Sequence, residues 1–340
     1  MKKLIGLFLT FIITAAMFSS NVLAKTEYEE IKTNIPSKIL FLGDSIATGY
    51  GLEGYKNGKE NCSSYANTLA EQYDKELAGK CETSMKNSAI DGQTSAELLK
   101  GLNDGIYDED LKNSDAVIIS IGGNDLLTVL WEFIVNDLHI NFNDSYADNQ
   151  QSDFDITKII ESITSLGARI DKNLESFDSN LTEIAKYIKE KTNGTLIIQT
   201  LYNPFDQFNQ EQVKEFISDK IKTLNSYIEL HKNDADSQYI VADVYSQFYG
   251  KGNELTRIKS MDIHPNQQGH DVIAQCVDKT IRTERYTYIT EKTKEAVQSS
   301  SIGQNNSDKS TIICFIAIGI VVIIAFVITI IKRKNTKKEN

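Results

Sequence analysis

The chain has 340 residues, of which 41% are hydrophobic and 24% charged, and its formal net charge is −11 at pH 7. This length predicts one or two domains. Between residues 25 and 310, 29 Lys and Arg stand against 46 Asp and Glu, which gives a net charge of −17. The acidic balance argues against nucleic acid or anionic lipid headgroups as the main partner, because such partners require a basic patch.

The N-terminus has the pattern of a secretory signal over residues 1–24. Lys2 and Lys3 form a charged start, residues 4–17 are an apolar run, and small residues up to Ala24 offer a cleavage site. An uncleaved membrane anchor is the alternative, although the apolar run is shorter than the roughly 20 residues that span a bilayer. We therefore expect the following part of the chain to be exported.

Short apolar runs separated by helical patterns fill residues 25–283. Parallel strands that are covered on both faces form near-continuous apolar runs, whereas helices repeat apolar residues three and four positions apart. This alternation predicts one α/β domain with a mostly parallel sheet. The predicted strands are 39–42, 116–121, 195–201 and 239–244, with a weaker candidate at 83–87, and the predicted helices lie around 65–73, 166–188, 213–228 and 272–281.

Three segments depart from this alternation. Residues 128–156 are polar and aromatic, which is typical of a lid, a binding loop or a disordered insertion. Residues 284–310 become rich in Ser, Asn, Gln and Lys and predict a polar stalk. Residues 311–331 form an uncharged run, long enough to cross about 30 Å of hydrocarbon as a helix. The basic residues of the tail, 332–340, are expected to stay on the cytoplasmic side.

The four cysteines give few constraints. Cys314 lies in the predicted membrane helix, and Cys276 occupies an apolar position of a predicted helix, as expected of a buried thiol. Cys62 and Cys81 could form a disulfide outside the cell or remain thiols, and the sequence leaves both open. No CxxC or HxxxH pattern occurs, which disfavours a structural zinc site.

Polar residues and glycines follow the predicted strands. Ser45 ends Gly43-Asp44-Ser45, Gly92 ends Ala89-Ile90-Asp91-Gly92, and Asn124 follows Gly122-Gly123. Ligands of open α/β sheets bind beyond the carboxyl ends of the strands, so these residues are candidates for one crevice. Each pattern taken alone is also typical of a plain turn or a helix cap.

His264 lies in Asp262-Ile263-His264-Pro265, just before the last predicted helix. Pro265 disfavours a helical conformation at the residue before it, so the imidazole is expected on a loop. A serine nucleophile needs a base to take its proton, and the base needs a group that orients it. The other histidines are expected to have no catalytic role. We expect His270 to be a structural residue within a helix, and His139 and His231 to be surface residues.

In this order, the four blocks resemble those of the SGNH/GDSL hydrolase family, from about residue 37 to residue 281. The resemblance implies a flavodoxin-like three-layer α/β/α sandwich with a five-stranded parallel sheet. It implies Ser45 as nucleophile, His264 as base and Asp262 as the acid that orients His264. It also implies an oxyanion hole made by the backbone N–H groups of Ser45 and Gly92 and the side chain of Asn124.

One residue departs from the family pattern. The common final block has its acid three residues before the histidine, where this chain has Met261. Asp262 stands only two residues before His264, which some members also show. The backbone or another carboxylate is the alternative partner of His264.

The resemblance implies an extracytoplasmic serine esterase or lipase that hydrolyses acyl or acetyl esters of a lipid or a glycan. The implied reaction requires no cofactor and no metal ion. An O-acyltransferase on the same scaffold and a non-catalytic surface-binding protein are the alternatives. The signal, the membrane helix and the basic tail together predict a single-pass protein of the cell membrane with its catalytic domain outside. The insertion at 128–156 is expected to decide the substrate.

Overall fold

The computed structural model describes residues 28–132, 156–207, 211–260 and 262–291. These residues lie in one compact unit that ends at Glu291. The predicted signal, the predicted membrane helix with Cys314, the basic tail and residues 133–155 of the insertion lie outside the described residues. No helix within the described ranges is both long enough and apolar enough to span a membrane.

A five-stranded sheet lies at the centre of the domain, with strand order β3-β2-β4-β5-β6. All four neighbouring pairs are parallel, so the predicted parallel sheet is confirmed. Each strand forms inside or within one residue of a predicted apolar run. The strands are β2 (Lys38–Gly43), β3 (Ser84–Asn87), β4 (Ala116–Ser120), β5 (Thr195–Gln199) and β6 (Ile240–Ala242).

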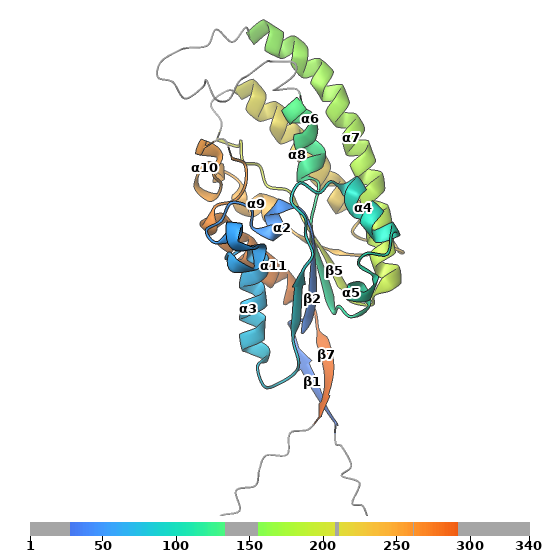
Figure 1. Ribbon diagram of the computed structural model, residues 1–340. Helices are drawn as coiled ribbons and strands as arrows, with labels where there is room; N and C mark the ends of the chain where they lie inside the picture. The colour runs from blue at the N-terminus through green and yellow to red at the C-terminus, as the bar shows by residue number, and fades with distance from the viewer. Residues whose placement is uncertain (1–27, 133–155, 208–210, 261, 292–340) are drawn as a thin grey trace, which may run out of the picture. The chain divides into compact units, whose positions relative to one another are not determined.

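Helices cover both faces of this sheet (Figure 1). Side chains alternate along β2: Leu40 and Leu42 pack into one apolar cluster, and Ile39 and Phe41 pack into the other. The first cluster is closed by α4 (Ser95–Asn103), α5 (Asp108–Lys112), α7 (Ile156–Lys191) and α8 (Glu211–His231). The second is closed by α3 (Tyr65–Leu77), α9 (Val244–Phe248) and α11 (Gln267–Ile281). The chain therefore forms the three-layer α/β/α sandwich that the resemblance implied.

The remaining elements are short and lie along the connections. They are α2 (Ser45–Thr48), η1 (Tyr55–Asn57), η2 (Lys59–Asn61), α6 (Gly123–Glu132), α10 (Gly252–Leu255) and η4 (Ile258–Ser260). Helix α6 takes up the first five residues of the segment predicted as an insertion, and α7 begins at its last residue.

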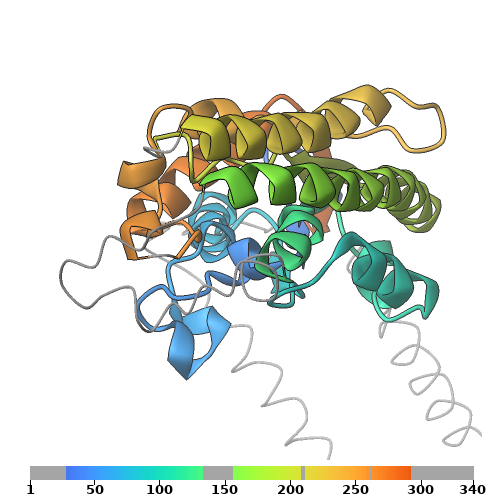
Figure 2. The same ribbon diagram turned by 90° about the horizontal axis from the view of Figure 1, so that it is seen from above.

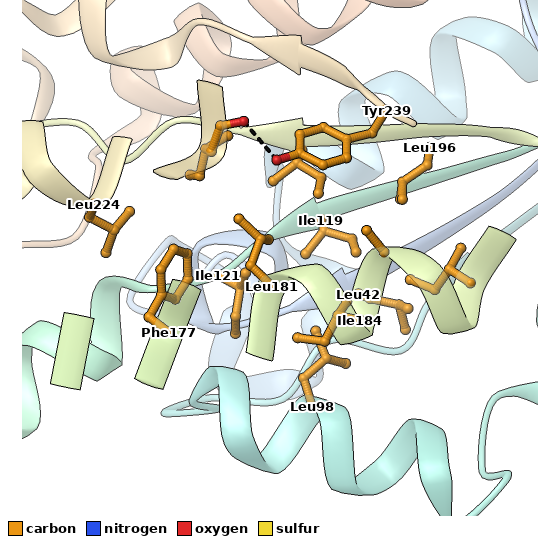
Figure 3. Packing of buried hydrophobic residues seen from close by; sticks show 14 of the residues in the cluster. Leu42, Leu98, Ile119, Ile121, Phe177, Leu181, Ile184, Leu196, Leu224 and Tyr239 are labelled. Atoms are coloured by element: carbon orange, nitrogen blue, oxygen red, sulfur yellow. Dashed lines mark hydrogen bonds between the residues drawn. The ribbon is translucent and has the colours of Figure 1, made fainter. Parts of the chain in front are cut away.

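Helix α7 contributes the largest apolar surface to the first cluster. Phe177, Leu181 and Ile184 of α7 lie in the same cluster as Ile119 of β4 (Figure 3). Each such side chain contributes roughly 1.5–3 kcal/mol when it is fully buried. Helix α8 lies alongside α7 (Figure 2), and its C-terminal end is held by Tyr239, whose hydroxyl donates to the Ile228 carbonyl at 2.7 Å.

A second, two-stranded sheet joins the two ends of the described chain. Strand β1 (Tyr28–Thr33) pairs antiparallel with β7 (Tyr286–Glu291), so that Tyr28 lies opposite Glu291. Residues 286–291 were predicted as the beginning of a polar stalk. They form a strand instead because Tyr286 and Tyr288 alternate with exposed residues, and the Tyr288 hydroxyl accepts from the Ser37 N–H at 2.7 Å.

The possible disulfide between Cys62 and Cys81 does not form, and both residues are free thiols. Cys62 precedes α3 and Cys81 follows it, so the length of this helix, about 20 Å, separates the two sulfur atoms. Cys62 is buried and its thiol lies 3.2 Å from the Lys59 carbonyl oxygen. Cys276 is partly buried against the second cluster, and burial raises the pKa of its thiol to about 11.

Candidate active site

Ser45 is the first residue of α2 and directly follows the carboxyl end of β2. The backbone just before Ser45 lies close against β4. A β-carbon at Gly43, whose φ is +111°, would lie 1.8 Å from the Ser120 carbonyl oxygen, so only glycine fits there. Asp44 caps α2, and its carboxylate accepts from the Ile46 N–H and the Ser120 hydroxyl, each at 3.1 Å. The glycine and the acid before Ser45 thus fix the serine at the edge of the sheet.

Asp44 is itself buried, with 2% of its surface exposed. Burial raises the pKa of this carboxyl to about 7, although the hydrogen bonds from the Ile46 N–H and the Ser120 hydroxyl favour the ionised form. Through these two hydrogen bonds, the Asp44 carboxylate holds the turn that carries Ser45.

His264 and Asp262 lie on the loop between η4 and α11. The Asp262 carboxylate turns back toward the residue two positions later and accepts from the His264 backbone N–H at 3.0 Å. The same oxygen, Oδ1, lies 2.6 Å from His264 Nδ1. The short spacing that departs from the family pattern therefore still lets the acid contact the ring, because the side chain closes a local turn.

The other ring nitrogen of His264 meets Ser45. His264 Nε2 lies 2.9 Å from Ser45 Oγ, although 219 positions separate the two residues in the chain. With Nδ1–H directed at Asp262, Nε2 is the nitrogen that accepts a hydrogen bond from the serine. Ser45, His264 and Asp262 thus form one continuous chain of hydrogen bonds.

Asn124 lies in the first turn of α6, beside the turn that contains Gly92. Its side-chain amide donates to the Gln93 carbonyl at 3.1 Å, and it lines the same pocket as Ser45 and His264. Gly92 has a φ of +73°, a conformation that favours glycine. The Thr48 hydroxyl of α2 donates to Asp91 at 2.5 Å, which holds this turn against the serine helix.

Arg257 is a residue of the site that the sequence patterns missed. Its guanidinium lies 2.9 Å from Asp262 Oδ2, the oxygen that His264 does not use, and it also donates to the Tyr50 carbonyl at 2.8 Å. The Tyr50 ring lies 4.8 Å from the His264 ring, measured between centroids. Arg257 therefore connects the acid of one loop to the aromatic neighbour of the histidine on another. The sequence feature that could have indicated this role is an arginine five residues before Asp262.

A pocket opens beside these groups. Ser45, Asn124 and His264 line it together with apolar side chains, most of which come from α6, α7, α8 and the segment after β5. The apolar lining residues are Ile46, Leu126, Ile170, Leu201, Pro204, Phe205, Phe216, Ile217, Ile221 and Ile263. The hydroxyl of Tyr202, which also lines the pocket, donates to the Ile263 carbonyl at 2.9 Å.

A protein-family model matches most of the domain described above. The model described as the GDSL-like lipase/acylhydrolase family matches residues 41–272, which is more than half of the chain. The chain belongs to the GDSL-like lipase/acylhydrolase family. It is therefore a GDSL-type serine hydrolase that acts on ester bonds.

Individual proteins resemble this chain at low sequence identity. An uncharacterised protein of Bacillus subtilis, YpmR, is 26% identical over 262 residues, which cover 76% of this chain and 87% of YpmR. Among solved structures, the lipase Lip_vut3 from a goat rumen metagenome is 21% identical, with 72% of this chain and 96% of that chain covered and a TM-score of 0.46. The acetylxylan esterase Axe2 of Geobacillus stearothermophilus is 17% identical, with 73% and 96% covered and a TM-score of 0.47. These likenesses concern the fold.

Proposed function

We propose that this chain hydrolyses carboxylic esters through an acyl-enzyme formed on Ser45, with His264 as the base and Asp262 as its orienting acid. The observation that carries the proposal is the continuous contact from Ser45 Oγ to His264 Nε2 at 2.9 Å and from His264 Nδ1 to Asp262 at 2.6 Å. This arrangement has the geometry of an activated nucleophile, in which the base is within hydrogen-bond reach and is oriented by a third group.

In the proposed first step, Ser45 Oγ forms a bond to the ester carbonyl carbon while His264 Nε2 takes the hydroxyl proton. The carbonyl oxygen gains negative charge, which the N–H groups of Ser45 and Gly92 and the Asn124 amide stabilise. The tetrahedral intermediate then breaks its bond to the alcohol oxygen, which receives the proton from His264. Asp262 stabilises the imidazolium throughout.

In the second step, water replaces the alcohol. His264 takes a proton from the water as the oxygen attacks the acyl carbon, and it returns a proton to Ser45 as the acid product leaves. A sugar or lipid alcohol in place of the water would give an acyltransferase. Product analysis with and without an acceptor alcohol separates the two activities.

The first test is covalent labelling of the nucleophile. A fluorophosphonate is expected to label the wild-type chain on Ser45, as read by mass spectrometry of the labelled peptide, and Ser45→Ala is expected to abolish both labelling and hydrolysis of p-nitrophenyl esters. Ser176→Ala is the matched control, because Ser176 is an exposed residue of α7 whose hydroxyl donates to the Lys172 carbonyl of the same helix. Ester hydrolysis that survives Ser45→Ala would refute the assignment.

We further propose that the enzyme works outside the cell and is held by residues 311–331. The charged and apolar pattern of residues 1–24 and the uncharged run with its basic flank support this proposal. The full chain is then expected in the membrane fraction, and a chain that stops at residue 310 in the medium. Recovery of the shortened chain inside the cell would contradict the location, without bearing on the chemistry of Ser45.

A further inference from the structure

The pocket beside Ser45 has two chemically different parts. One part is formed by the groups that can exchange protons or hydrogen bonds with a reacting carbonyl, Ser45, Asn124 and His264. Apart from the buried Asp44 and from Lys220, the rest of the lining is mostly apolar and comes mainly from three helices and the segment after β5. Six side chains make most of these walls: Leu126, Ile170, Phe205, Phe216, Ile217 and Ile221.

The apolar walls belong to well-packed parts of the fold. Ile170 of α7, Leu126 of α6 and Ile221 of α8 are each at most 3% exposed, so the pocket is bounded by side chains whose positions are set by the core. Helices α7 and α8, which both contribute to the lining, pack against each other (Figure 2). The pocket is therefore a built feature of the helical layer.

Among the described residues that line the pocket, one lysine is present, and its ammonium group points away from the pocket interior. Lys220 Nζ lies 2.7 Å from Asp171 Oδ1, an acid whose side chain is 52% exposed. The lysine thus directs its ammonium group to a partner near solvent and presents its methylene stem to the pocket.

The sheet order separates the two arms of a bound ester. From β2, which carries Ser45, most apolar walls follow β4 and β5 in the sheet order. Asp91 instead follows β3 and accepts from Tyr55, whose ring contacts Tyr50. The alcohol must leave near His264, which protonates it, and Tyr50 beside His264 is 43% exposed. The acyl arm is the part of the substrate that remains for the apolar side.

We propose that this pocket binds the hydrocarbon chain of the acyl group, so that the preferred substrates are esters of linear acids several carbons long. The inference rests on the proposed function, since it takes Ser45 as the nucleophile. A sugar ring in the same place would lose hydrogen bonds to water, because the apolar walls offer no replacement. A hydrocarbon chain gains from the burial, and an acetyl group would leave most of the pocket without contacts.

The test is a series of p-nitrophenyl esters from acetate to octanoate. Each methylene that enters the pocket is expected to raise kcat/KM about fourfold, so hexanoate, which has four more methylenes than acetate, should exceed acetate by up to about 250-fold. A second series, alkyl acetates with increasing alcohol length, is expected to show no such rise. A rise confined to the alcohol series would overturn the assignment of the pocket to the acyl arm.

Two substitutions with opposite expected effects examine the walls. Ile217→Phe narrows the pocket and should lower the hexanoate-to-acetate ratio of kcat/KM at least about tenfold, while Ile170→Ala widens it and should move the optimum to longer chains. General destabilisation cannot move the preference in both directions. Phe216→Trp serves as a second narrowing variant if Ile217→Phe does not fold. Leu230→Phe is the control, since Leu230 lies on the same helix but is 66% exposed.

The outcomes separate this inference from the proposed function. Ser45-dependent hydrolysis of all chain lengths at equal rates would leave the esterase in place and overturn the acyl pocket. An unchanged ratio in both narrowing variants would do the same. A chain that hydrolyses no ester and takes no fluorophosphonate on Ser45 would refute the proposed function and the pocket assignment together.

Discussion

Arg257 holds the oxygen of Asp262 that faces away from His264, at 2.9 Å, while Asp262 Oδ1 contacts the ring of His264 at 2.6 Å. The carboxylate is thus fixed from both sides. Because the acid stands only two residues before the histidine, its side chain closes a tight turn, and Arg257 adds a contact from outside that turn. The arginine is a positioning residue, since it acts on the histidine through Asp262.

The first prediction concerns this arginine. Arg257→Leu is expected to lower kcat about tenfold, because hydrogen bonds to charged groups contribute roughly 1.5–3 kcal/mol and part of that holds Asp262 in place. Removing a positive charge near Asp262 also makes the imidazolium easier to form, so the acidic limb of the kcat/KM profile should move to higher pH. Arg285→Leu is the control, because Arg285 is exposed and its guanidinium donates to the carbonyl of the neighbouring Glu284. A lower rate with an unmoved pH profile would indicate a purely structural role.

The second prediction ranks the acid below the nucleophile. Asp262→Ala leaves Ser45 and His264 in the site but removes the group that orients the ring, so kcat is expected to fall by about 10²–10⁴. Ser45→Ala should cost on the order of 10⁶. Steady-state kinetics with one ester at saturating concentration compares the two. Equal losses would mean that the acid and the serine act as one unit.

The third prediction concerns the oxyanion. Asn124→Ala is expected to lower kcat by about 10²–10³ with a small change in KM, because the amide serves a charge that develops after substrate binding. Its hydrogen bond to the Gln93 carbonyl holds the amide beside the Gly92 turn. Asn113→Ala, at an exposed site bonded to the Glu109 carbonyl, is the matched control. A change in KM alone would place Asn124 in ground-state binding.

The fourth prediction concerns stability and pH. His231, at the C-terminal end of α8, lies 2.7 Å from Asp234 and 2.8 Å from Asp178 of α7. Burial acts to lower its pKa, but the hydrogen bonds that the protonated ring donates to the two carboxylates outweigh burial and raise the pKa above 6.5. A raised pKa in the folded state stabilises the fold fully below pH 6.5, and this contribution is lost as the pH rises through the folded pKa.

His231→Gln is therefore expected to reduce the free energy of unfolding by about 1 kcal/mol at pH 5.5, and by less at pH 9. Urea unfolding of the wild type and of His231→Gln at each pH gives the difference in the free energy of unfolding. The titration of other buried groups, such as Asp44 and His270, contributes equally to both proteins and cancels in this difference. A difference that grows with pH would reverse the sign and exclude a protonated His231 as the connection between α7 and α8.

The central sheet was predictable because buried parallel strands leave continuous apolar runs, such as 116–121. Ser45, Asn124 and His264 could be placed at one edge of the sheet because each follows a strand or precedes a helix. Arg257 could not be found this way, since its partner Asp262 is defined by a loop conformation. Strand β1 escaped notice because its residues are exposed or half-buried and form no apolar run, and it pairs with β7, which lies more than 250 residues later in the chain.

The pairing of Tyr28 with Glu291 has a mechanical consequence for the whole enzyme. Strand β1 leads directly into the amino end of β2, while Ser45 lies beyond the carboxyl end of the same strand (Figure 1). Strands β1 and β7 thus form one stem at the amino end of β2, at the opposite end of this strand from Ser45 and the pocket beside it. A fusion partner, a solid support or a lipid bilayer attached through that stem would leave the entrance unobstructed, and the domain could be immobilised there without loss of turnover.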